Sequence, residues 1–183
     1  MMPQPCATAL RYSAFIDGGP KAGIFNHAAR EITPFDLLDR TRNLVAYAGG
    51  KPVGTMRIVL PDARQSAREG TRFNLPMEQS LHFREVPEGA RIAEVGRLAI
   101  HVDHRGSDVI RLLYKSVHRI MSEHDIRYYA GSSLTGASRI EEAISYYRTL
   151  LSHGFASKDI IAEPRSCSDT DDQHEPIFRA SSR

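Results

Sequence analysis

Apolar residues recur in short runs of strand length in the first third of the chain. Residues 44–47 and 52–60 form two such runs, and Ala-Gly-Gly-Lys lies between them. Gly49 and Gly50 supply the positive φ angles that a tight turn needs, so the two runs predict a β-hairpin. Pro61 marks the end of the second strand because proline cannot donate to a strand ladder.

A second patterned block follows further along the chain. Residues 91–102 are predicted to form a buried strand, and residues 126–130 a second strand. Residues 107–124 and 138–151 are predicted helices, and a last strand is expected within residues 154–161. The first helix is predicted from apolar residues at helical spacing, namely Val109, Ile110, Leu113, Val117, Ile120 and Met121.

The remaining segments are less regular. Residues 7–30 are predicted to begin as a strand or a helix and to continue as a loop, and residues 62–90 as a long polar connection. The order of elements is hairpin, loop, strand, helix, strand, helix, strand, which indicates a mixed α/β sheet flanked by helices. We expect a single domain over residues 1–163 and a polar, mobile tail over residues 164–183.

Composition narrows the class of protein. The chain has 183 residues, 41% of them hydrophobic and 25% charged, which is ordinary for a soluble globular protein. Its net charge of +2 gives no reason to expect nucleic acid or more than peripheral membrane contact. Cys6 and Cys167 form no metal or redox motif, so we expect the protein to be located in the reducing cytoplasm. The histidines lack metal-ligand spacing, so no metal site is expected.

The turn before the first predicted helix is short and basic. Arg105 and the backbone N–H groups of residues 106–110 lie where a helix begins, which is a position that favours an anion. A phosphate or pyrophosphate of a pantetheine carrier fits such a turn. Asp108 would repel a pyrophosphate that faced it, whereas a single phosphate is less demanding. The alternative is an ordinary helix N-terminus with Asp108 as a favourable acid in the first turn.

Two ionisable residues, Glu94 and Arg97, lie inside the buried strand. Alternation places them on opposite faces, but a bulge at Gly96 would bring both to one face. A half-buried carboxylate can take a proton from an ammonium nucleophile. Free N–H groups at a bulge can stabilise the oxyanion of a thioester carbonyl. The alternative is a structural ion pair of Glu94 with Arg57 or Arg97.

This order of elements, with an anion-binding turn between strand and helix, resembles the GNAT acyltransferase fold. Arg105 matches the first position of the GNAT signature at this turn, while Asp108 and Ile110 stand in place of its small residues. In the GNAT pattern, a tyrosine one turn before a Gly-Phe pair protonates the leaving thiolate. Tyr147 precedes Gly154-Phe155 by a longer gap, so a packed helix tyrosine is the alternative to that role.

Several short motifs in order resemble one GNAT branch, the acyl-homoserine-lactone synthase-like enzymes. This branch includes the long-chain N-acyl amino acid synthases, the ornithine-lipid acyltransferases and the exosortase-associated acyltransferases. The resemblance covers roughly residues 10–155, with Gly96 where the branch has serine and without the Trp of the lactone synthases. Its motifs are Leu10-Arg-Tyr-Ser-Ala-Phe15, the acidic pair Asp36 and Asp39, Gly54-Thr-Met-Arg57, Glu94-Val-Gly-Arg97, His101 to Leu113, and Ser145 to Leu151.

The resemblance implies roles for individual residues. Glu94 would be the general base and Tyr147 the general acid. The acceptor site would comprise Arg11, Phe15, Asp36, Asp39, Arg57 and Arg97, in which Arg57 and Arg97 suit a carboxylate. The donor site would comprise the strand residues Leu98, Ala99 and Ile100 for the thioester carbonyl. Its phosphate would be held by Arg105, Gly106, Ser107, Asp108, Val109 and Ile110.

These residues together predict an N-acyltransferase without a bound cofactor. The acyl group would come from the phosphopantetheine thioester of acyl-carrier protein or CoA, and the acceptor would be an amino-acid-like amine. One alternative is a small-acyl N-acetyltransferase that uses acetyl-CoA, and another is a GNAT-like ligand-binding module without catalysis. Phe73, Leu75 and Met77 either line an acyl pocket or pack into the core.

Overall fold

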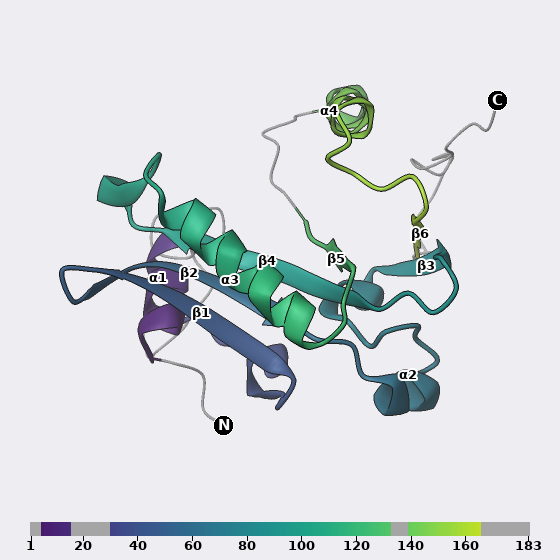
Figure 1. The fold of residues 1–183 in the computed structure, drawn as a ribbon, viewed down its shortest axis with the longest axis horizontal. Helices are drawn as coiled ribbons and strands as arrows, with labels where there is room; N and C mark the ends of the chain where they lie inside the picture. The colour runs from purple at the N-terminus through teal and green to yellow at the C-terminus, as the bar shows by residue number, and fades with distance from the viewer. Residues whose placement is uncertain (1–4, 16–29, 133–138, 166–183) are drawn as a thin grey trace. The chain divides into compact units, whose positions relative to one another are not determined.

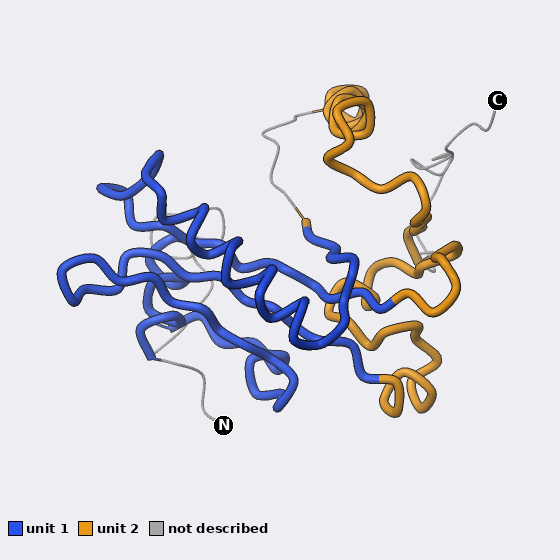
Figure 2. Tube along the Cα trace, in the orientation of Figure 1, with its two compact units in different colours: residues 1–62, 91–131 blue, residues 63–90, 132–183 orange. Residues whose placement is uncertain are grey.

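The computed structural model describes residues 5–15, 30–132 and 139–165 of the chain. Contacts between Cα atoms divide it into two compact units (Figure 2). The first unit comprises residues 1–62 and 91–131, and the second comprises residues 63–90 and 132–183. The expected single domain over residues 1–163 stays a prediction, and residues 166–183 of the expected tail lie outside the described residues.

A four-stranded sheet forms the centre of the first unit (Figure 1). Its strands are β1 (Thr41–Ala48), β2 (Lys51–Val59), β4 (Ile92–Ile100) and β5 (Tyr128–Ala130), in the order β1-β2-β4-β5. The pairs β1–β2 and β2–β4 are antiparallel and β4–β5 is parallel. The predicted mixed sheet and hairpin are therefore confirmed, and the turn glycines have the positive φ angles that the hairpin requires.

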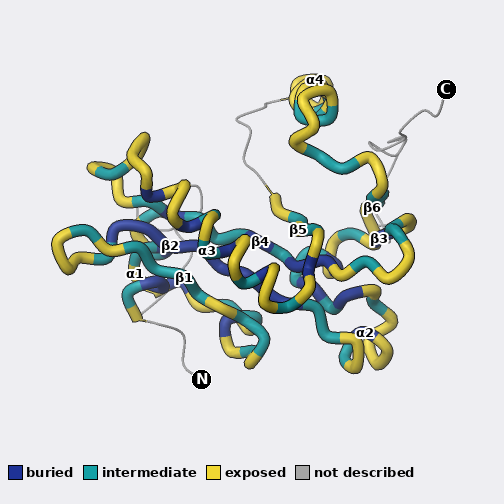
Figure 3. Tube along the Cα trace, viewed as in Figure 1, coloured by how far each residue is buried: buried dark blue, intermediate teal, exposed yellow. Residues whose placement is uncertain are grey.

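Helix α3 (Val109–Glu123) covers one face of this sheet and forms the hydrophobic core with it (Figure 1). Its buried residues recur every four positions, as the periodicity predicts, and they are Val109, Leu113, Val117 and Met121. They pack with Met56 and Ile58 of β2 and with Val95 of β4. Figure 3 shows the buried segments concentrated along β2 and β4.

Helix α1 (Pro5–Phe15) and the 3-10 turn η1 (Pro34–Leu37) lie against the sheet as well. The sequence left the start of the chain open between strand and helix, and the structure shows a helix there. Its buried side is small and polar, comprising Ala7, Thr8 and Arg11. That composition gives no hydrophobic periodicity, which is why the pattern did not identify the helix. Residues 16–29 lie outside the described residues.

The second unit corrects the prediction of an unstructured connection over residues 62–90. This stretch contains the helix α2 (Ala63–Glu69), the turn η2 (Pro76–Gln79) and the strand β3 (Leu81–Glu85). β3 pairs antiparallel with β6 (Ile161–Pro164), and the helix α4 (Ile140–Ser152) lies between them in sequence. Both helical pieces of residues 63–79 are short and polar, so they escape a search for apolar periodicity.

The apolar island of residues 73–77 packs inside the second unit. Phe73 and Leu75 are buried, and the ring of Phe73 meets the ring of Phe83 edge-to-face with centroids 5.3 Å apart. The buried carboxylate of Glu78 accepts hydrogen bonds from the backbone N–H groups of Arg72, Phe73 and Leu75. These contacts favour core packing over an acyl pocket for Phe73 and Leu75.

None of the helices in the described part of the chain has the length and apolar character needed to cross a bilayer. Helix α4 begins at Ile140 with Arg139 as its N-cap, slightly later than predicted. Residues 133–138, which precede it, are not among the described residues. The strand β5 is also shorter than predicted, because it begins at Tyr128.

Gly54 is predicted to be required for the seating of α3 on the sheet. A Cβ atom at this position would lie 2.4 Å from Cγ1 of Val109, and a β-branched side chain has little freedom to turn away. We expect Gly54→Ala to lower the free energy of unfolding by about 1–3 kcal/mol. Denaturant unfolding will measure the loss.

The matched control is Gly96→Ala, since no atom lies within 4 Å of the Cβ position at Gly96. Its free energy of unfolding should stay within about 0.5 kcal/mol of the wild type. Equal losses in both variants would contradict this account of Gly54.

Candidate active site

Glu94 and Arg57 lie on one face of the sheet. In the antiparallel pairing of β2 with β4, Arg57 stands opposite Gly96 and Val59 stands opposite Glu94. Opposite residues of such a pair point to the same side, and so do residues two apart in one strand. The charge of Glu94 acts on Arg57, which agrees with this placement. Met56 and Ile58, which alternate with Arg57, face α3 instead.

A bulge in β4 changes the direction of the next side chains. Thr55 pairs with Ala99 and Arg57 with Gly96, so β4 has one more residue than β2 across this interval. Arg97, in the bulge, has a φ of +54°, in the left-handed region that favours glycine. The predicted bulge is therefore present, but Arg97 rather than Gly96 takes the unusual conformation.

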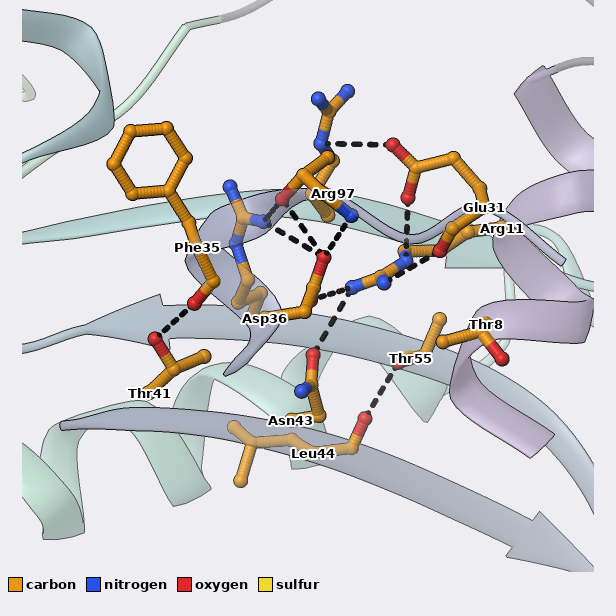
Figure 4. A network of polar contacts seen from close by, with 12 residues as sticks. Thr8, Arg11, Glu31, Phe35, Asp36, Thr41, Asn43, Leu44, Thr55 and Arg97 are labelled. Carbon is orange, nitrogen blue, oxygen red and sulfur yellow. Dashed lines mark hydrogen bonds and ion pairs between the residues drawn. The ribbon is translucent and has the colours of Figure 1, made fainter. Parts of the chain in front are cut away.

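Asp36 is the centre of a buried ion network on this side of the sheet (Figure 4). Its Oδ1 accepts a hydrogen bond from Nη1 of Arg11 at 2.9 Å, and its Oδ2 accepts one from Nη1 of Arg57 at 3.2 Å. The backbone N–H and the hydroxyl of Thr33 also donate to Oδ2, each at 2.8 Å. Arg11 is completely buried and Asp36 is 4% exposed.

Arg11 connects α1 to three other segments. Besides Asp36, it donates to Oδ1 of Asn43 in β1 at 3.0 Å and to the backbone oxygen of Glu31 at 2.8 Å. Its Nε lies 2.8 Å from Oε2 of Glu31, as an ion pair without hydrogen-bond alignment. A helix, a 3-10 turn and a strand are thus joined through one guanidinium.

The network shifts the ionisation of its members. Burial alone would raise the pKa of Asp36, but the Thr33 N–H and the charges of Arg11 and Arg57 outweigh it and lower that pKa. Burial lowers the pKa of Arg57, and the charges of Arg97 and Arg11 add to this effect. The charges of Asp36 and Glu94 oppose it. Arginine nonetheless stays protonated in proteins, so Asp36 and Arg57 form an ion pair.

Arg97 extends the network toward solvent. Its Nε lies 3.4 Å from Oε1 of Glu31, and its side chain is 28% exposed. Figure 4 shows its two terminal nitrogens pointing away from Glu31 and Asp36. Arg97 is thus paired with Glu31, and the alternative of a structural ion pair of Glu94 with Arg57 or Arg97 stays a prediction. The arrangement can bind an anion at Arg97 beside a carboxylate, Glu94, on the same strand.

The structure brings together four of the predicted acceptor residues, namely Arg11, Asp36, Arg57 and Arg97. Phe15 ends α1 and is half-buried, and Asp39 is exposed, with its backbone oxygen accepting from Arg42. Neither takes part in the ion network as far as the described residues show.

Sequence reasoning missed Glu31, Thr33 and Asn43. For Thr33 a signal existed, because Thr33 and Asp36 have the spacing of a capping box. Glu31 and Asn43 carry no such local signal.

The predicted phosphate turn has the backbone groups that an anion requires. It contains the short 3-10 turn η3 (Val102–His104), and Gly106 has a φ of +78°. In the described chain, the N–H groups of Gly106, Asp108, Ile110 and Arg111 make no hydrogen bond. Four unpaired donors at the start of a long helix suit a phosphate group.

The side chains of this turn differ in their placement. Arg105, Ser107 and Ile110 are exposed, whereas Val109 is buried in the core, so only its backbone can serve a ligand. Asp108 is paired with Nε of Arg111 at 3.0 Å, and this hydrogen bond lowers the pKa of Asp108. The positive partner offsets the repulsion expected between Asp108 and a phosphate.

The strand residues predicted to hold the thioester carbonyl follow the bulge. The pairing of β4 with β5 ends at Glu94 and Ala130, so within the described residues the later part of β4 pairs with β2 alone. Leu98, Ala99 and Ile100 lie in this part. Tyr147 lies on α4 of the second unit and is half-buried, and its predicted role stays a prediction.

The N-acyl amino acid synthase FeeM family matches residues 7–173 of this chain. The chain belongs to this family. Membership confirms the predicted acyltransferase branch, and the protein is a FeeM-family N-acyltransferase. A search of the curated proteins found no match.

Solved structures with a similar fold include two acetyltransferases. One is a ribosomal-protein-alanine N-acetyltransferase from Brucella melitensis biovar Abortus 2308, with 14% identity, a TM-score of 0.40, and coverage of 76% of this chain and 75% of that chain. The other is the aminoglycoside acetyltransferase meta-AAC0020 from an uncultured soil metagenomic sample, in complex with trehalose. It has 10% identity, a TM-score of 0.42, and coverage of 75% of this chain and 70% of that chain. Membership in the FeeM family rests on the sequence match alone.

Asp36→Asn is predicted to destabilise the protein, because it leaves Arg11 and Arg57 buried without their shared carboxylate. We expect a loss of about 3–5 kcal/mol in the free energy of unfolding near pH 7. Asp39→Asn, at an exposed position, should change it by less than about 0.5 kcal/mol.

The same pair of proteins has a predicted pH dependence. Because folding lowers the pKa of Asp36, its stabilisation is complete above the unfolded pKa of about 3.9 and is lost as the pH falls through the folded value. The difference between wild type and Asp36→Asn should therefore shrink below about pH 4. A difference that stays constant down to pH 2 would contradict the assignment.

Proposed function

We propose that this FeeM-family protein transfers an acyl group from a phosphopantetheine thioester to the amine of an amino-acid-like acceptor. The thioester is carried by acyl-carrier protein or by CoA. The observation that carries the proposal is the placement of Glu94, Arg57 and Arg97 beside one bulge, with Glu94 and Arg57 on the same face of the sheet. The carboxylate of Glu94 suits the ammonium group of an amino acid, and the guanidiniums suit its carboxylate.

The charges of the site favour a zwitterionic acceptor. Three guanidiniums, those of Arg11, Arg57 and Arg97, stand against the two carboxylates of Glu31 and Asp36, which leaves one positive charge. Glu94 supplies the third carboxylate on the sheet face. An acceptor would place its ammonium at Glu94 and its carboxylate at the exposed edge of Arg97, which keeps the local charge balanced.

The proposed reaction is the aminolysis of a thioester. Glu94 takes a proton from the acceptor ammonium, directly or through water, and the free amine attacks the thioester carbonyl carbon. A C–N bond forms, the C–S bond breaks, the nitrogen gives up a second proton, and the pantetheine thiolate leaves and takes a proton. Backbone N–H groups of Leu98, Ala99 and Ile100 would stabilise the oxyanion, since this part of β4 pairs with β2 but, within the described residues, no longer with β5.

The donor would be anchored at its phosphate end. The unpaired N–H groups of the turn from Gly106 to Arg111 and the exposed side chain of Arg105 would hold the phosphate. This turn directly follows β4, so donor and acceptor would meet along one strand and its continuation. Tyr147 remains the proposed proton donor to the leaving thiolate.

Glu94→Gln tests the proposed general base. We expect it to lower kcat by roughly 10²–10⁴-fold, because an amide cannot take up the ammonium proton. The measurement is thiol release from acyl-carrier-protein and acyl-CoA substrates in the presence of amino acids, with thermal unfolding measured in parallel. Glu123→Gln, at an exposed position of α3, is the matched control and should keep wild-type turnover.

Unchanged turnover in a folded Glu94→Gln variant would rule out the general-base role. Transfer of acetyl groups alone, with no longer acyl chain accepted, would favour a small-acyl acetyltransferase. A wild-type protein that releases no thiol from either donor with any amino acid would refute the proposed reaction.

A further inference from the structure

Glu31 lies between a buried guanidinium and a half-exposed one. Its Oε2 is 2.8 Å from Nε of Arg11, and its Oε1 is 3.4 Å from Nε of Arg97. Each carboxylate oxygen therefore faces a different arginine, as Figure 4 shows. Glu31 is 7% exposed, so water screens these interactions little.

The backbone of Glu31 is held as firmly as its side chain. Its N–H donates to the backbone oxygen of Thr8 at 3.0 Å, and its own backbone oxygen accepts from Nη2 of Arg11 at 2.8 Å. Both partners belong to α1. The carboxylate of Glu31 is thus a fixed point, attached to the helix and directed at Arg97.

Arg97 needs such a fixed point for two reasons. It occupies a left-handed backbone conformation that disfavours a side chain, and its guanidinium is close enough to Arg57 for their charges to repel. A long side chain with several rotatable bonds would otherwise move toward solvent. Contact with Glu31 at Nε leaves the two terminal nitrogens directed outward.

We propose that Glu31 is a positioning residue for the acceptor, which acts by holding the guanidinium of Arg97 in the orientation that receives the acceptor carboxylate. This inference rests on the proposed function, since it assigns the orientation of one proposed acceptor-binding group. Glu31 itself does not touch the acceptor. Because Glu31 is attached to α1, the position of this helix determines where the guanidinium of Arg97 is held beside the bulge of β4.

A double-mutant cycle of Glu31→Asp and Arg97→Gly tests this role. The shorter side chain keeps a charge for Arg11 but draws back from Arg97, and glycine keeps the left-handed conformation without the guanidinium. We expect Glu31→Asp to raise the KM for the acceptor roughly tenfold, with kcat within about twofold of the wild type. In the Arg97→Gly background, the same substitution should leave that KM unchanged.

Two controls accompany the cycle. Glu123→Asp, at an exposed position of α3, should leave the KM unchanged. Denaturant unfolding of all four proteins separates folding from binding, because any loss of stability through Arg11 should be the same with and without Arg97. An unchanged acceptor KM in folded Glu31→Asp, or an equal rise in the Arg97→Gly background, would overturn the inference.

A spectroscopic arm separates this inference from the proposed reaction. The Nε–H signal of Arg97 in ¹⁵N-arginine-labelled protein is identified by its disappearance in Arg97→Gly, and it should shift in Glu31→Asp. A shift together with the KM cycle supports the inference. A shift in a protein without turnover would refute the proposed function and reduce Glu31 to a structural contact. Turnover with no shift would overturn the inference alone.

Discussion

The carboxylate of Asp36 is the group on which the polar side of the first unit depends. It accepts from Arg11 of α1 and from Arg57 of β2, and all three side chains are buried. Removing the carboxylate would leave two buried positive charges without their shared counter-charge, which costs far more than the loss of one surface ion pair. The helix and the strand are therefore held in one arrangement by charge, where a hydrophobic contact would tolerate sliding.

This constraint divides the two faces of the sheet between different tasks. In β2, Met56 and Ile58 point to the apolar core beneath α3, while Thr55 and Arg57 point to the other side. The alternation lets a single strand serve both packing and the active face. The bulge in β4 then adds Arg97 near Glu94, which regular alternation would not allow. A rigid core on one face thus supports charged groups on the other.

Turn residues and hydrophobic spacing predicted those elements of the fold that depend on the local sequence. The hairpin, β4 and α3 follow from turn glycines and from hydrophobic spacing, and all three are present. For α1 the pattern left strand and helix open, because the buried side of this helix carries little hydrophobic periodicity. Helix α2 escaped prediction because it is short and polar. The bulge was predicted at Gly96, between Glu94 and Arg97, yet Arg97 adopts the left-handed conformation, with Glu31 as its partner.

The candidate site was predictable to a similar extent. The family resemblance selected Arg11, Asp36, Arg57 and Arg97, which the structure gathers in one place. It could not supply Glu31, whose contacts to Arg11 and Arg97 span 20 and 66 positions of the sequence. Such pairings arise only when helix and sheet are packed together, so they are properties of the tertiary structure.

The central claim is that this charged face joins an acyl group to an amino-acid amine. The most direct measurement is mass spectrometry of lipid extracts from cells that express the wild-type protein and from cells without it. The account predicts an N-acyl amino acid that is present only with the protein, with an amide bond and a free carboxylate. An extract in which only acetylated amines appear, or in which no acylated amine differs between the two cultures, would contradict it.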